Sequence, residues 1–139
     1  MNPIARNMLA FIVAMIAGGI VNMGIITMSG SIIPPPEGAD MTTPEGIKAA
    51  LPLLQPRHFI MPFLAHAFGA FTGALVVALL AVTHKMKFAL SIGAINLIGG
   101  IAAVFMIPAP VWFCAVDLVF AYIPMAYIAG RLGNAASKQ

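Results

Sequence analysis

Charged side chains are scarce in this chain of 139 residues: only 8% are Asp, Glu, Lys or Arg, whereas 61% are hydrophobic. A soluble domain carries about 25% charged residues, and a globule of this size cannot hide so much apolar surface from water. The composition therefore excludes a water-soluble globule. We expect a protein of a cell membrane, the bacterial inner membrane in particular, with the lipid bilayer as its main surroundings.

Several chemical signatures are also missing. Cys114 is the single cysteine, so no internal disulfide can form. No pair of cysteines or histidines has the spacing of a metal site, and no glycine-rich loop for phosphate is present. The net charge is +3, but the basic residues flank hydrophobic runs and do not alternate with aromatic residues. The sequence therefore predicts no cofactor, no metal and no nucleic-acid partner.

Four long apolar runs fill most of the chain, each close to the roughly 20 residues that cross a bilayer. We place the spans at about residues 4–29, 58–83, 87–107 and 111–131. Backbone polar groups in lipid must bond within their own segment, which favours helices. The expected fold is an all-α membrane protein, a four-transmembrane-helix bundle that forms a single integral membrane domain over residues 1–139.

Basic residues are distributed unequally between the two sides of the predicted spans. Five lie on the side of the termini: Arg6, Lys85, Lys87, Arg131 and Lys138. Only Lys48 and Arg57 lie on the other side. Because cytoplasmic loops carry the excess of Lys and Arg, this pattern predicts that both termini are cytoplasmic.

The connection at residues 30–57 is the one long outer loop. Three successive prolines, at 34–36, predict a stiff extended segment. Thr42, followed three residues later by Glu45, is typical of a capping box and predicts a short amphipathic helix over about residues 43–51. Four residues are candidates for a site at the outer mouth: His58, Glu37, Asp40 and Arg57.

Small residues form stripes along the spans. In lipid, such residues let helices approach closely, where no hydrophobic force drives association. We expect five glycines to lie at helix contacts: Gly18, Gly69, Gly73, Gly93 and Gly100. Pro124 removes a backbone hydrogen bond to the carbonyl of Phe120 and predicts a kink in the last span. Asn7 lies outside these stripes and is expected at contacts between subunits.

Each span carries one strongly polar residue away from its ends, namely Asn22, His66, Asn96 and Asp117. Counted at about 1.5 Å per residue, three of them lie about 9 to 11 Å below the outer interface, and Asn96 lies about a turn deeper. An ionised aspartate at that depth costs several kcal/mol unless it is paired. We therefore expect Asp117 either to accept a hydrogen bond from His66, with the two amides lining the pair, or to take up a proton itself. The pair either fixes helix register or marks a proton, ion or substrate site.

The leading functional hypothesis is a small oligomeric transporter or channel, with His66 and Asp117 as its protonatable pair. The alternative is a non-catalytic accessory or assembly subunit of a larger membrane complex, which docks through its glycine stripes and proline-rich loop. A membrane enzyme or a metal-binding protein is the weaker alternative. No catalytic residue can be assigned, and no sequence motif identifies a family.

Overall fold

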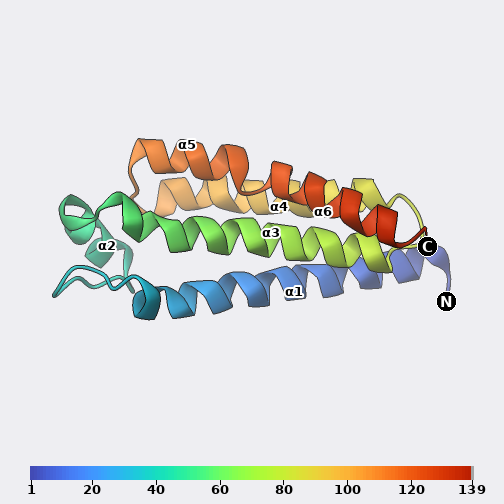
Figure 1. Ribbon diagram of the computed structural model, residues 1–139, viewed down its shortest axis with the longest axis horizontal. Coiled ribbons are helices and arrows are strands. Elements are labelled where there is room, and N and C mark those ends of the chain that lie inside the picture. Colours follow the sequence, from blue (N-terminus) through green and yellow to red (C-terminus); the bar gives the residue numbers. More distant parts are fainter. Residues whose placement is uncertain (139) are drawn as a thin grey trace.

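The computed structural model describes residues 1–138, in which the regular secondary structure is helical and no strand occurs. Six α-helices follow one another along the chain (Figure 1): α1 (Pro3–Ile32), α2 (Pro44–Ala50), α3 (Ile60–Leu80), α4 (Lys85–Met106), α5 (Val111–Phe120) and α6 (Ile123–Ala136). Two short 3₁₀ helices, η1 (Leu51–Leu53) and η2 (Pro56–Phe59), lie between α2 and α3. The prediction of an all-helical chain is confirmed.

Four helical segments are long and apolar enough to cross a membrane, which indicates an integral membrane protein. They are Pro3–Ile32, Pro56–Leu80, Lys85–Met106 and Val111–Ala136. The number of spans agrees with the sequence prediction, but their limits differ. The first helix continues to Ile32 instead of ending near residue 29, and the last segment consists of two helices, α5 and α6.

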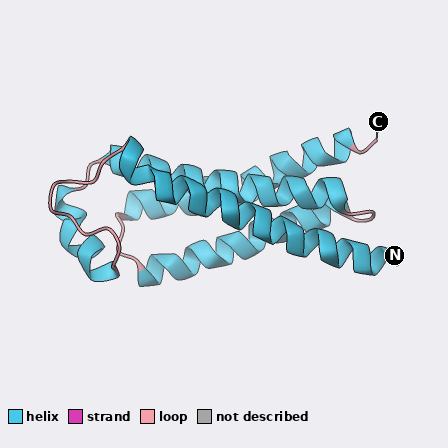
Figure 2. Cartoon of the chain, turned by 90° about the horizontal axis from the view of Figure 1, so that it is seen from below, coloured by secondary structure: helices cyan, strands magenta, loops and turns pink. Residues whose placement is uncertain are grey.

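Helix α3 is the centre of the arrangement, because it packs against α1, α4 and α6. Both termini lie at one end of the elongated molecule, and α2 with its flanking loops lies at the opposite end (Figure 1). The view from below shows the same separation of the termini from the long connection (Figure 2). Helix α5 contacts α3 far less than α6 does.

The core consists mostly of alanine. Ala14, Ala65, Ala74 and other alanines are fully buried, and Ile92 and Val77 are the largest side chains that are completely enclosed. Large apolar side chains such as Phe105, at 86% exposed, point outward instead. Small residues inside and large apolar residues outside are the arrangement expected of helices that pack closely in lipid.

The last span is interrupted at Ala121 and Tyr122. Pro124 lies in the first turn of α6, where its missing N–H leaves the carbonyl of Phe120 without a helical donor. Tyr122, which precedes α6, has φ −113° and ψ −75°. The predicted kink at Pro124 is therefore confirmed, and it is a complete break between two helices rather than a bend.

The outer loop contains a short helix near its predicted position, but the predicted capping box is wrong. The N-cap of α2 is Thr43, whose hydroxyl accepts a hydrogen bond from the Gly46 N–H at 3.1 Å. The backbone N–H and the hydroxyl of Thr42 both donate to Asp40 instead. These bonds, that of the Thr42 hydroxyl foremost, hold the pKa of Asp40 below its ordinary value of 3.8.

Asn7 is buried inside the chain and joins α1 to the turn between α3 and α4. Asn7 is only 6% exposed. The amide nitrogen donates to Thr83 Oγ1 at 2.7 Å, and the amide oxygen accepts from the Val82 N–H at 2.9 Å. The expectation that Asn7 serves contacts between subunits is therefore wrong, because both of its polar atoms are used within the chain.

Candidate functional site

His66 and Asp117 form a direct contact between α3 and α5. The distance from His66 Nδ1 to Asp117 Oδ1 is 2.8 Å. The aspartate side chain is 7% exposed and the histidine side chain 29% exposed. The two residues are 51 positions apart in the sequence and meet inside the helical assembly, as we expected from their similar predicted depths. The carboxylate is the more enclosed of the two side chains.

Tyr122 completes the site, and the sequence analysis did not find it. Its hydroxyl donates to Asp117 Oδ2 at 2.8 Å, and its ring stacks on that of His66 with centroids 5.7 Å apart. In an unbroken helix, a residue five positions after Asp117 would lie about 140° around the axis, because each residue turns by about 100°. The break before α6 allows the tyrosine to reach back. Pro124 was the sequence signal that pointed to this break.

The protonation states of this triad (His66, Asp117 and Tyr122) follow from its hydrogen bonds. An ionised carboxylate can only accept, so His66 Nδ1 must carry a proton when Asp117 is charged. The other ring nitrogen, Nε2, then remains able to take up a second proton. With a neutral histidine the triad has a net charge of −1, and with a protonated histidine its net charge is zero. The net charge of the triad therefore depends on whether Nε2 of His66 also carries a proton.

Asn22 and Asn96 do not join the triad through any hydrogen bond between described residues. The Asn96 amide donates to the Ile92 carbonyl one turn earlier on its own helix, at 2.8 Å. Asn22 packs against Gly69, three residues after His66, and its Oδ1 atom is buried without a hydrogen-bond partner. The predicted four-residue network is thus reduced to one pair, to which Tyr122 is added.

The four outer-mouth candidates have different surroundings. His58 Nδ1 accepts from the Gln55 N–H at 2.8 Å within η2. Asp40 is occupied by its two threonines, and Glu37 and Arg57 are exposed. No hydrogen bond or ion pair joins these four residues to one another in the described part of the chain. The site at the outer mouth therefore stays a prediction.

The five predicted glycines all lie where helices approach closely. A Cβ atom on Gly18 would stand 2.6 Å from the Gly69 carbonyl oxygen, and one on Gly73 would stand 3.0 Å from Ile92. A Cβ atom on Gly93 would stand 2.6 Å from the nearest atom of α6. A Cβ atom on Gly100 would stand 2.6 Å from the nearest atom of the Tyr122 side chain. Gly100 thus provides the space that the tyrosine of the triad occupies.

Within residues 1–138, no three His, Cys, Asp or Glu side chains are grouped so that they could hold a metal ion. Comparisons of the chain with protein-family models, with curated proteins and with solved structures found no match.

Proposed function

We propose that this protein is a small membrane transporter or channel in which the triad of His66, Asp117 and Tyr122 exchanges protons. One observation carries the proposal: a carboxylate in a membrane span, 7% exposed, accepts hydrogen bonds from two other titratable side chains. Ionisable groups inside a membrane are costly, and they commonly belong to proton or ion pathways. The partly exposed histidine is the group through which a proton would enter.

The interruption of the last span supports the same function. The break follows about 11 residues after the start of α5, which corresponds to about 16 Å at 1.5 Å per residue and so to the middle of a bilayer about 30 Å thick. Transporters commonly form their binding sites from discontinuous helices at this depth. Asp117 lies in the last turn of α5 before the break, and Tyr122 lies within the break.

Orientation and assembly complete the proposal. The basic residues at the end of the termini favour a cytoplasmic location for both termini, in a cell membrane such as the bacterial inner membrane. The chain would act as a homo-oligomer. Gly24 and Gly99 support this, because a Cβ atom at each would meet nothing within 4 Å. These exposed small residues on α1 and α4 would let a second subunit approach closely.

The test is proton movement by the purified full chain in liposomes that contain a pH-sensitive dye. A pH gradient or a membrane potential is imposed, with and without opposing gradients of Na⁺ or K⁺. We expect wild-type protein to move protons, and Asp117→Asn and His66→Gln to reduce the rate to that of empty liposomes. Tyr122→Phe should lower the rate partially, because it removes one donor to the carboxylate.

Tyr127→Phe is the matched control, since this tyrosine is exposed and contacts only Arg131 among its described side-chain partners. It should leave the rate unchanged, and circular dichroism should show that every variant is folded. Wild-type flux in folded Asp117→Asn and His66→Gln would contradict the proposal, as would a wild-type chain that moves no protons. If such an inactive chain retained a foreign subunit in native mass spectrometry, the accessory-subunit alternative would replace it.

A further inference from the structure

Two adjoining surface cavities lie between the start of α4 and the end of α6, far from the triad. The first, of about 480 Å³, is lined by the apolar Val82 and Met86 and by six polar or basic residues: His84, Lys85, Lys87, Asn134, Ser137 and Lys138. The second, of about 550 Å³, shares Met86, Asn134 and Lys138 with the first and adds Tyr127 and Arg131. The two cavities together therefore form one continuous depression.

The first cavity carries three lysines, Lys85, Lys87 and Lys138, and no acidic side chain is among its lining residues within residues 1–138. The four acidic residues are Glu37, Asp40, Glu45 and Asp117, which belong to the long connection and to the triad. Helix α4 also begins here without a side-chain cap or an acidic residue in its first turn. Its unpaired N–H groups add a partial positive charge to that of the lysines.

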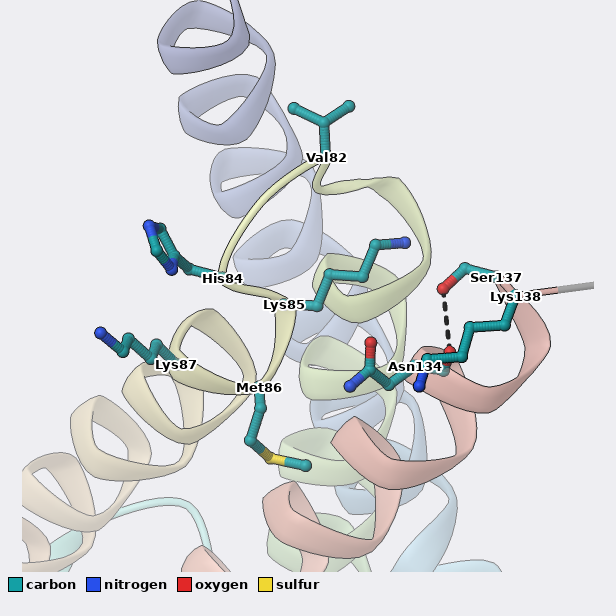
Figure 3. A pocket seen from close by; sticks show the side chains of 8 residues that line it. All are labelled: Val82, His84, Lys85, Met86, Lys87, Asn134, Ser137 and Lys138. Carbon is teal, nitrogen blue, oxygen red and sulfur yellow. Dashed lines mark hydrogen bonds between the residues drawn. The ribbon is translucent and has the colours of Figure 1, made fainter.

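The side chains of the cavity are arranged around a common space. Figure 3 shows Lys85 extending from the first turn of α4 toward the end of α6, where Asn134, Ser137 and Lys138 lie. The Lys138 side chain returns toward Asn134, while His84 and Lys87 extend to the other side of the turn. Two ammonium groups and one amide thus face the depression from two different helices.

We propose that this depression binds the phosphate headgroup of an anionic phospholipid. Lys85 and Lys138 would pair with the phosphate, and Asn134 would donate from its amide. The second cavity favours a lipid over a free phosphate compound, because it offers the apolar Met86 and the ring of Tyr127 directly beside the basic cavity. Basic pockets between helices at a membrane surface are a known means of binding anionic headgroups.

The test measures lipid binding to the purified full chain in neutral detergent by native mass spectrometry. The probes are phosphatidylglycerol, phosphatidylcholine and inorganic phosphate, each titrated separately. We expect phosphatidylglycerol to bind more tightly than phosphatidylcholine. The double variant Lys85→Gln/Lys138→Gln should weaken phosphatidylglycerol binding about 30-fold, since each basic residue near an anionic headgroup contributes about fivefold.

Two further variants separate a site from a general charge effect. Lys48→Gln/Arg57→Gln removes the same two charges at the opposite end and should leave the affinity unchanged. Lys85→Arg/Lys138→Arg keeps the charges and should retain binding. Equal affinity for both lipids, or equal losses in the two glutamine variants, would overturn the proposal. Inorganic phosphate that binds as tightly as phosphatidylglycerol and displaces it would overturn the assignment to a lipid.

Discussion

The crossing of α1 and α3 provides a direct test of the packing argument, because two neighbouring glycines of α1 have opposite surroundings. A Cβ atom on Gly18 would stand 2.6 Å from the Gly69 carbonyl oxygen and 3.3 Å from the Gly73 backbone. A Cβ atom on Gly19 would meet nothing within 4 Å. Gly18→Ala and Gly19→Ala therefore add the same methyl group to the same helix at two adjacent positions.

The magnitude follows from the geometry. The Gly69 carbonyl belongs to the backbone of α3, so the helices themselves must part by about 0.8 Å to turn 2.6 Å into an ordinary contact of 3.4 Å. Overpacking of this kind costs about 1–3 kcal/mol. Alanine is also favoured over glycine within a helix by up to about 1 kcal/mol. This second effect is common to both variants and cancels when they are compared.

The assay is the free energy of unfolding in mixed micelles, measured for the wild type and both variants by circular dichroism during titration with a denaturing detergent. Gly19→Ala should be neutral or slightly stabilising, and Gly18→Ala should be about 1–3 kcal/mol less stable than Gly19→Ala. If the two variants were equally stable, the close crossing of α1 and α3 would not exist in the folded protein. The reasoning from small-residue stripes would then fail as well.

Two further predictions concern the ends of the molecule. Asn7→Ala should lower the free energy of unfolding by about 1–2 kcal/mol, because it removes two hydrogen bonds between α1 and the turn after α3. The titration with denaturing detergent described above measures this change. Substitution of the exposed Ser91 by alanine is the neutral control. At Asp40, hydrogen bonds within the loop lower the pKa of the carboxyl group. The loop contacts therefore stabilise the folded state fully at pH values above the unfolded pKa of about 3.9. Their contribution is lost as the pH falls through the lower pKa of the folded state. The Thr42 amide signal in nuclear magnetic resonance spectra should therefore titrate with a midpoint below 3.8, and Asp40→Asn should abolish that titration. An unchanged stability of Asn7→Ala, or a midpoint at or above 3.8, would refute the respective prediction.

Much of the helical framework could be predicted from composition and residue size. The scarcity of charge and the length of the apolar runs were sufficient for four spans, because lipid leaves the backbone few alternatives. The positions of close contact could also be predicted, since only glycine and alanine allow helices to approach as Gly18 and Gly69 do. Equal depth in the bilayer and the cost of an unpaired carboxylate favoured a contact between His66 and Asp117, whereas equal depth alone did not bring Asn22 to them.

Other details depended on information that the sequence order does not contain. The direction in which Asn96 points is set by competition between a neighbouring helix and its own backbone, and here the Ile92 carbonyl is the acceptor. The cap of α2 is Thr43 instead of Thr42, and Asp40 accepts hydrogen bonds from the hydroxyl groups of both threonines. In both cases, two local hydrogen bonds of similar strength were available, and periodicity could not distinguish between them.

The break in the last span and the triad are one structural feature. An uninterrupted helix would carry Tyr122 away from Asp117, and the carboxylate would then keep His66 as its only partner among the contacts described. The break leaves backbone groups without helical partners at membrane depth, which is tolerated where the segment is buried in protein or lines a cavity. Ala121 and Tyr122 are buried here, at 0% and 3% exposed. Interrupting the helix thus costs backbone hydrogen bonds but allows the Tyr122 hydroxyl to donate a second hydrogen bond to the Asp117 carboxylate. We therefore expect the proposed function of the triad to depend on Pro124 as well as on its three members.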